Sequence, residues 1–332
     1  MSNAKTAKTI PLGKTGPAVF PIALGCMSMS PIYGEPTDEQ GIRTIQAAIE
    51  RGVTLIDTGD FYGMGHNELL VGRALAGRRD KVQLSVKFGA MRDPKGAFVG
   101  VDCRPAAVKS FAAYSLKRLG VDVIDVYRPA RLDPSVPIED TIGAIKELID
   151  QGYVRHIGLS EVGVETLRRA HAVHPIADLQ IEYSLASRAP EAKIFPVLAE
   201  LGISATLYGV LSRGLLSGKR PSSPADYRSY LPRFTGEEGA RNAAIVEKLR
   251  ALADAGGRTP SQLCVAWVLA KQPTLVPLIG ARTQDQLEDV LGALANPLSA
   301  KEVVEVEALV PQGAIEGPRY QPAMMAHLDS EK

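Results

Sequence analysis

The sequence predicts an α/β protein built as a (β/α)8 (TIM) barrel, with an N-terminal β-hairpin and an extra C-terminal helix and tail. First, short apolar runs alternate eight times with amphipathic stretches. Second, the runs are nearly continuous in apolar residues, which is typical of parallel strands covered by helices. Third, no G-x-G-x-x-G follows the first run, as a dinucleotide-binding doubly wound sheet would require. Eight strand–helix units close into a barrel, and a doubly wound sheet is the alternative.

The predicted strands share this apolar character and are Pro21–Gly25, Val53–Asp57, Lys81–Lys87, Val121–Tyr127, Val154–Leu159, Asp178–Ile181, Ile203–Leu207 and Thr274–Ile279. The stretches between and after them have apolar residues at helical spacing, and glycines such as Gly152 and Gly202 follow their ends. Two segments lie outside the repeat. Residues 9–20 predict a hairpin that closes the bottom of the barrel. Residues 299–332 predict a helix and a tail that is either disordered or folded over the site, all within one domain over 1–332.

Composition excludes several classes of protein. The chain has 332 residues, 38 basic and 37 acidic, so its net charge of +1 is unlike that of a nucleic-acid-binding or polybasic membrane-binding protein. Its three cysteines, Cys26, Cys103 and Cys264, form no Cys/His cluster, so we expect reduced thiols and no metal site. We also expect no signal peptide and no membrane span, which favours a cytoplasmic protein. The expected partner is a small-molecule substrate, and the sequence does not predict the oligomeric state.

Chemistry in a barrel belongs at the carboxyl ends of the strands. Asp57 and Lys87 end two neighbouring predicted strands, and Tyr62 follows shortly after Asp57. A phenol beside an ammonium group has a lowered pKa and suits the role of a general acid. The alternative is a purely structural Asp57–Lys87 ion pair with Tyr62 in a loop.

Six segments in order resemble the aldo-keto reductase superfamily over nearly the whole chain. They are DTGDFYG (57–63), SVKFG (85–89), GLSE (158–161), LQIEYSL (179–185), LYGVLSRGLLSGK (207–219) and PLIGARTQDQLEDVLGA (277–293), and residues 12–30 resemble the family's opening hairpin and first strand. The resemblance implies hydride transfer from NADPH to an aldehyde or ketone. Tyr62 would be the proton donor, assisted by Lys87 and Asp57.

The resemblance also implies an extended NADPH site. Ser160 and Gln180 would bind the nicotinamide carboxamide, and Tyr208 would stack on the ring. Arg282 and Lys219 would favour the 2′-phosphate of NADPH. The full set of expected cofactor-binding residues is Gly25, Met27, Asp57, Ser160, Gln180, Tyr208, Gly209, Leu211, Arg213, Lys219, Gly280, Arg282, Gln286 and Asp289. Glu161 stands where many members have asparagine.

Ala130 occupies the place of the family's catalytic histidine. Losing such a hydrogen-bond donor typically lowers turnover about 100- to 1000-fold, so either activity is low or another donor, for which Arg128 is the candidate, replaces it. Ala130 also leaves room for a bulkier ketone. We expect the substrate to contact Tyr33, Phe61, Phe88 and Arg128. Two alternatives remain: a cofactor-binding regulatory subunit with weak reductase activity, and a lyase or isomerase that uses Asp57 and Lys87 without nicotinamide.

Overall fold

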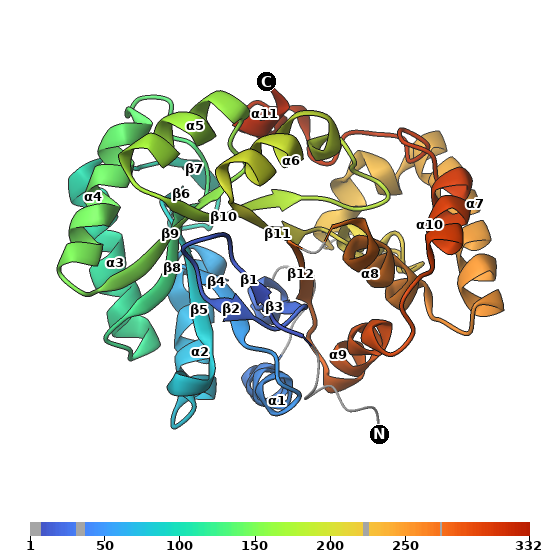
Figure 1. Ribbon diagram of the computed structural model, residues 1–332, viewed down its shortest axis with the longest axis horizontal. Helices are drawn as coiled ribbons and strands as arrows, with labels where there is room; N and C mark the ends of the chain where they lie inside the picture. Colours follow the sequence, from blue (N-terminus) through green and yellow to red (C-terminus); the bar gives the residue numbers. More distant parts are fainter. Residues whose placement is uncertain (1–7, 31–36, 222–225, 273) are drawn as a thin grey trace.

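Eight parallel strands form a closed barrel surrounded by helices (Figure 1). The computed structural model describes residues 8–30, 37–221, 226–272 and 274–332. Around the barrel the strands follow one another as β3, β4, β5, β8, β9, β10, β11 and β12, and β12 pairs with β3. The predicted barrel is therefore confirmed, and the doubly wound alternative is wrong.

The barrel strands lie close to the predicted ranges, and helices lie between them, as predicted. The barrel strands are β3 (Ala23–Gly25), β4 (Leu55–Gly59), β5 (Gln83–Phe88), β8 (Ile124–Pro129), β9 (Val154–Ser160), β10 (Ile176–Glu182), β11 (Ser204–Tyr208) and β12 (Leu275–Gly280). The helices are α1 (Asp38–Glu50), α2 (His66–Leu75), α3 (Pro105–Leu119), α4 (Ile138–Asp150), α5 (Val164–Val173), α6 (Pro190–Leu201), α7 (Gly236–Ala255), α8 (Pro260–Lys271), α9 (Gln284–Leu291), α10 (Ala300–Leu309) and α11 (Pro322–Met325). Figure 1 shows α7 and α10 outside the ring of helices that contacts the strands.

A hairpin closes the amino-terminal end of the barrel, as predicted. Its strands are β1 (Ile10–Pro11) and β2 (Ala18–Val19), which pair antiparallel. Leu12 and Val19 are fully buried in an apolar cluster with residues from inside the barrel. The turn needs glycine at position 13, because a Cβ there would lie 2.4 Å from the carbonyl oxygen of Ala177 and φ is +67°.

Side chains alternate between the inside of the barrel and the surrounding helices, because successive residues of a strand point to opposite faces. Leu55 and Val126 belong to the cluster inside the barrel. Ile56 and Tyr127, one residue further on, belong to the large cluster between the strands and the helices. Two residues beyond Leu55 and Val126, the inward positions become polar, with Asp57 and Arg128 both buried. The alternation therefore places polar groups in the upper part of the barrel.

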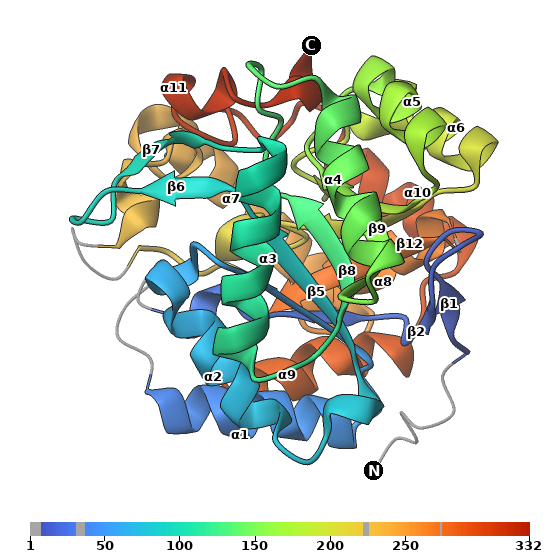
Figure 2. The ribbon, with the colours of Figure 1, turned by 90° about the vertical axis from the view of Figure 1, so that its left-hand side faces the viewer.

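Two additional segments cover the carboxyl-terminal end of the barrel. A hairpin of β6 (Ala90–Arg92) and β7 (Phe98–Val101), absent from the sequence prediction, is inserted between β5 and α3. Figure 2 shows this hairpin and α11 at the same end of the barrel. The rings of Phe98 and His327 meet edge to face at 5.3 Å, so the hairpin and the C-terminal tail are in contact. Of the two alternatives for the tail, the structure shows the folded one.

No helix within the described ranges is both long enough and apolar enough to cross a membrane.

Candidate active site

An ion pair between Asp57 and Lys87 lies at the carboxyl ends of β4 and β5. Both side chains are buried, and Lys87 Nζ donates to Asp57 Oδ1. Asp57 Oδ2 accepts from Ser85 Oγ at 2.7 Å and from Gln180 Nε2 at 2.9 Å. Burial lowers the pKa of Lys87, and Asp57 opposes that effect by favouring the ammonium form. The carboxylate therefore has three fixed donors and holds the lysine in one place.

Tyr62 lies beside this pair on the loop after β4. Its ring centroid is 5.4 Å from Lys87 Nζ, and the side chain is 7% exposed. Asn67 supports the loop region, because its amide oxygen accepts from Thr58 Oγ1 and its amide group donates to the Cys26 carbonyl oxygen. The short turn Tyr62–Gly65 has left-handed backbone at its last three residues. The structure thus brings together the three residues that the sequence assigned to proton transfer.

A cavity of about 1040 Å³ opens above these residues. It is larger than the usual pocket for one drug-sized ligand, so it has room for an extended cofactor and a small substrate. Most residues that the sequence assigned to the site line it: Gly25, Met27, Asp57, Phe61, Tyr62, Lys87, Ser160, Gln180, Tyr208, Gly209, Leu211, Arg213, Lys219, Gly280, Arg282 and Gln286. Tyr33 lies outside the described residues. Asp289 does not line the cavity, and its carboxylate accepts from Thr259 Oγ1 at 2.7 Å.

Two buried hydroxyl groups in the cavity wall have no hydrogen-bond partner among the described residues. They are Ser28 Oγ and Ser160 Oγ. A buried polar group normally has a partner, so these two oxygens are suited to bind a polar ligand. Ser160 lies at the end of β9, next to Gln180 of β10 in register. Ser160 and Gln180 together can bind a carboxamide, a group that both donates and accepts hydrogen bonds.

Cations gather at the other end of the cavity. Lys219, Arg228 and Arg282 all line it, and burial together with the charges of the two arginines lowers the pKa of Lys219. Arg228 forms an ion pair with Asp226 at 2.6 Å. Positive side chains gathered in this way favour an anionic ligand. This end of the cavity is therefore suited to a phosphate.

Two of the residues predicted to contact substrate lie outside the cavity lining, Phe88 because of strand alternation and Arg128 because of its depth in the barrel. Phe88 follows inward-pointing Lys87 and so points outward, where it is fully buried and stacks on Tyr127 with 4.3 Å between ring centroids. Arg128 points inward but lies below the cavity floor, fully buried. Its guanidinium pairs with Asp178 at 2.9 Å and donates to Ser85 Oγ at 3.1 Å. Neither side chain lines the cavity.

Ala130 and Arg131, directly after β8, do line the cavity. Ala130 is 2% exposed and has no side-chain donor. Arg131 Nη1 donates to the Ala130 carbonyl oxygen at 2.6 Å. Arg131 Nε is buried and has no hydrogen-bond partner among the described residues. The sequence prediction assigned the cation of the pocket to Arg128 and missed Arg131.

Glu161 anchors the C-terminal tail. It accepts from Arg319 Nη1 at 2.8 Å and Nη2 at 2.7 Å, and from Tyr208 Oη at 2.7 Å. Burial raises the pKa of Glu161, but the hydrogen bonds and charge of Arg319 outweigh it and leave the pKa at about 2. Tyr320 Oη lies 3.1 Å from Tyr208 Oη. The tail therefore fixes the tyrosine that was predicted to stack on nicotinamide, and no local sequence motif signals the Arg319 contact.

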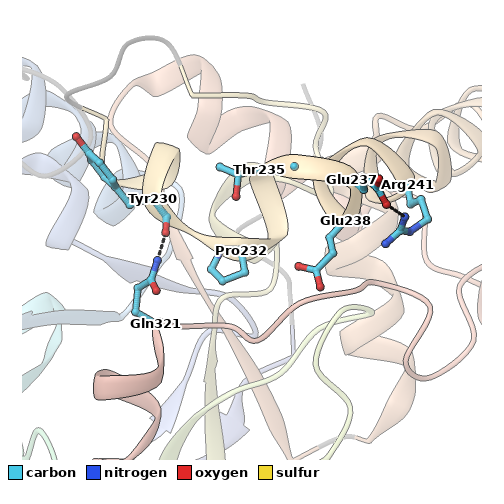
Figure 3. A pocket seen from close by; sticks show the side chains of 8 residues that line it. Tyr230, Pro232, Thr235, Glu237, Glu238, Arg241 and Gln321 are labelled. Atoms are coloured by element: carbon cyan, nitrogen blue, oxygen red, sulfur yellow. Dashed lines mark hydrogen bonds and ion pairs between the residues drawn. The ribbon is translucent and has the colours of Figure 1, made fainter.

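A second hollow lies outside the barrel, at the start of α7 (Figure 3). Its lining includes Glu237, Glu238 and Arg241, and Arg241 pairs with Glu237 and with Glu316. In Figure 3 the Gln321 side chain donates to the Tyr230 carbonyl oxygen, which ties the tail to the 3-10 helix Tyr227–Tyr230. This hollow is therefore a contact between the tail and the start of α7, whereas most residues that the sequence assigned to the site line the barrel cavity.

Comparison with known proteins shows the family of this chain. Residues 21–311 match the model of the aldo/keto reductase family. The chain belongs to this family. A soybean (Glycine max) protein, "Probable aldo-keto reductase 1", is 41% identical over 320 residues, which cover 94% of this chain and 91% of that protein. The aldo/keto reductase is thus an oxidoreductase acting on carbonyl and alcohol groups, as predicted, and not a lyase or isomerase.

Solved structures of the family have the same fold as this reductase. The glycerol dehydrogenase AKR11B4 from Gluconobacter oxydans has a TM-score of 0.84 and 29% identity, over 97% of this chain and 99% of that one. The aldo-keto reductase AKR11C1 from Bacillus halodurans, solved in its holo form, has a TM-score of 0.76 and 28% identity, over 95% and 99% of the two chains. Family membership brings with it a nicotinamide cofactor.

Proposed function

We propose that this aldo/keto reductase uses NADPH to reduce an aldehyde or ketone to an alcohol, with Tyr62 as the proton donor. The observation that carries the proposal is the buried Asp57–Lys87 pair beside Tyr62, on the floor of a cavity lined by the unpartnered Ser160 hydroxyl. Such a grouping of titratable residues in a cleft is typical of catalytic sites.

Each catalytic residue has a distinct role. A nicotinamide cofactor, when bound, would supply the hydride that the carbonyl carbon accepts. Tyr62 donates its phenolic proton to the carbonyl oxygen, which completes the alcohol. Lys87 stabilises the tyrosinate that remains, because a nearby ammonium favours the charged form of a phenol. Asp57 opposes the effect of burial on the pKa of Lys87 by favouring the ammonium form, and its carboxylate fixes the position of Lys87.

The cofactor-binding residues follow from the two ends of the cavity. Ser160 and Gln180 would hold the carboxamide; Gln180 uses its NH₂ group on Asp57, so its carbonyl oxygen is the acceptor. Tyr208, held by Glu161 and Tyr320, would stack on the ring. Lys219 and Arg282 would bind the 2′-phosphate, which favours NADPH over NADH. The remaining contacts would come from Gly25, Met27, Gly209, Leu211, Arg213, Gly280, Gln286 and, toward the adenine, Asp289.

The assay is NADPH consumption with a panel of aldehydes, ketones and quinones. We expect Tyr62→Phe to lower kcat by about 100- to 10,000-fold, the usual contribution of a general acid. Tyr114→Phe is the matched control, because Tyr114 is 61% exposed on α3 and should leave kcat unchanged. Equal activity of wild type and Tyr62→Phe would refute the role of Tyr62.

A second candidate function follows from Ala130, which supplies no donor to the carbonyl oxygen. A cofactor-binding regulatory subunit needs the cofactor site but little turnover. Tight NADPH binding without turnover on the whole panel would favour this alternative. We also propose a cytoplasmic location, since the three cysteines are unpaired and buried, as expected of a protein in a reducing compartment.

A further inference from the structure

The barrel cavity is strongly cationic. Its lining includes eight basic side chains: Lys87, Arg92, Lys95, Arg131, Arg213, Lys219, Arg228 and Arg282. Among the described residues of the lining, Asp57 is the single carboxylate and is paired with Lys87, while Arg213 and Arg228 pair with Glu182 and Asp226, which are not part of the lining. Arg213, Lys219, Arg228 and Arg282 follow β11 and β12 and lie at the end assigned to the cofactor. Arg92, Lys95 and Arg131 are not explained by the cofactor.

Arg131 lies two residues after the end of β8, and its neighbour Ala130 donates its backbone N–H to the Phe88 carbonyl oxygen, next to Lys87, at 2.8 Å. Its charge is also one of those that lower the pKa of buried Lys87. Arg131, Lys87 and Tyr208 line the same cavity. A substrate placed for hydride transfer occupies this same space.

Among the described residues, Arg131 forms no ion pair with a carboxylate. Its side chain donates to the Ala130 carbonyl oxygen, and its Nε is buried without a partner among those residues. Glu161, a carboxylate whose charge acts on Arg131, already accepts two hydrogen bonds from Arg319. A buried guanidinium N–H without an acceptor is unfavourable, so a ligand that supplies an acceptor is favoured.

Part of the cavity wall is apolar and aromatic. Phe61, Met64, Phe98 and Met324 line the same cavity as Arg131. The Arg92 guanidinium lies 5.8 Å from the Phe61 ring centroid and 5.9 Å from that of Phe98, so it packs against the aromatic wall. An apolar wall that also carries guanidinium groups fits a molecule with an apolar body and a carboxylate.

We propose that Arg131 determines substrate specificity and that the preferred substrate is an aldehyde or ketone that also carries a carboxylate. The inference rests on the proposed reductase function. The carboxylate accepts from the Arg131 guanidinium, and this contact orients the carbonyl group toward Tyr62. Substrate binding is therefore assigned to Arg131 instead of Arg128, the cation expected from the sequence.

The test compares 4-formylbenzoate with its methyl ester, which has the same aldehyde but no charge. For wild type, kcat/KM should be at least about tenfold higher for the carboxylate. Arg131→Met should lower kcat/KM for the carboxylate about 10- to 100-fold, the usual effect of losing a hydrogen bond to a charged group, and change that for the ester less than about threefold. Arg131→Lys should give an intermediate loss of kcat/KM for the carboxylate, because lysine keeps the positive charge but lacks the planar guanidinium that donates two hydrogen bonds to one carboxylate.

Lys146→Met is the control, since it removes the same charge from the outer face of α4, where Lys146 pairs with Asp150. Circular dichroism and thermal unfolding check that each variant is folded. A wild-type preference for the ester, or an equal loss for both substrates in Arg131→Met, overturns the proposal.

Binding separates this proposal from the reductase function. If wild type reduces neither aldehyde, the proposed function fails, and calorimetric titration with 4-formylbenzoate still tests Arg131. Binding that is lost in Arg131→Met and kept in Lys146→Met supports the anion site. Absence of binding to wild type, or equal binding to all three proteins, refutes it.

Discussion

Removing the charge of Glu161 should loosen the C-terminal tail and weaken cofactor binding. Glu161→Gln keeps the shape of the side chain but loses the ion pair with buried Arg319. The pKa of Glu161 is lowered from its usual 4.5 to about 2, by Arg319 against the opposing effect of burial. That change corresponds to about 3 kcal/mol of native-state stabilisation, since one pKa unit is worth about 1.4 kcal/mol.

The pH dependence of unfolding gives the sign of this effect. Because the folded-state pKa lies below the unfolded-state value, the unfolded chain binds more protons at intermediate pH. The contribution of Glu161 is therefore complete above about pH 4.5 and is lost as the pH falls toward 2. In Glu161→Gln, this part of the acid destabilisation should disappear, and stability at pH 7 should be lower by about 3 kcal/mol.

Urea denaturation at pH 7 and at pH 4 measures both effects, and the fluorescence of bound NADPH measures cofactor affinity. We expect affinity to fall about tenfold, because Tyr208 Oη then donates to a neutral amide oxygen instead of a carboxylate and is held less strongly. Glu200→Gln is the matched control. The Glu200 carboxylate accepts two hydrogen bonds from the Arg168 guanidinium, with N–O distances of 2.7 and 2.6 Å, but this ion pair is exposed. Its loss should therefore change stability by less than about 1 kcal/mol. An equal loss of stability in the two variants would refute the reasoning.

Three further predictions concern the cofactor, the barrel interior and Ala130. Lys219→Ala should raise the Kd for NADPH about tenfold and leave that for NADH within about twofold, as measured by fluorescence titration; an equal change for both cofactors would contradict the phosphate assignment. Gly158→Ala should destabilise by about 1–3 kcal/mol, because the new Cβ would lie 2.9 Å from Arg128 Cζ and 2.9 Å from Asp178 Oδ1. Gly143→Ala, where nothing lies within 4 Å of a new Cβ on α4, should instead stabilise slightly, and chemical denaturation compares the two. Ala130→His should raise kcat on a neutral aldehyde, by about 100-fold if the imidazole reaches the carbonyl oxygen, whereas Ala130→Leu, which adds bulk without a donor, should not; equal rates in both variants would exclude a donor effect.

Local sequence pattern was sufficient to predict the barrel and much of the cavity. Strand periodicity and position at strand ends are properties of short segments, and they predicted all eight barrel strands and the Asp57, Tyr62 and Lys87 group. The same periodicity could have prevented one error. Lys87 and Phe88 are adjacent on one strand, so they cannot both point into the barrel, and only one of them could belong to the site.

Other features depend on contacts between distant segments and have no local signal. Glu161 and Arg319 are 158 residues apart in the sequence, and neither residue by itself predicts a buried ion pair. The choice between Arg128 and Arg131 likewise depended on depth along the barrel axis. Counting inward positions from Val126 places Arg128 at the level of Asp178, below the cavity floor, where an acidic partner is already present.

Depth along the barrel axis also explains why the charges of the barrel have different roles. Asp178 pairs with Arg128, Asp57 pairs with Lys87, and Ser85 links the two pairs by donating to Asp57 and accepting from Arg128. This network is neutral, and removing one member would leave its partner charged and buried, which typically destabilises by about 3–5 kcal/mol. It therefore holds Lys87 in place without adding a net charge to the barrel. Arg131 follows β8 and is not part of this network, so under the proposed function substrate preference can change at Arg131 while Asp57, Tyr62 and Lys87 stay fixed.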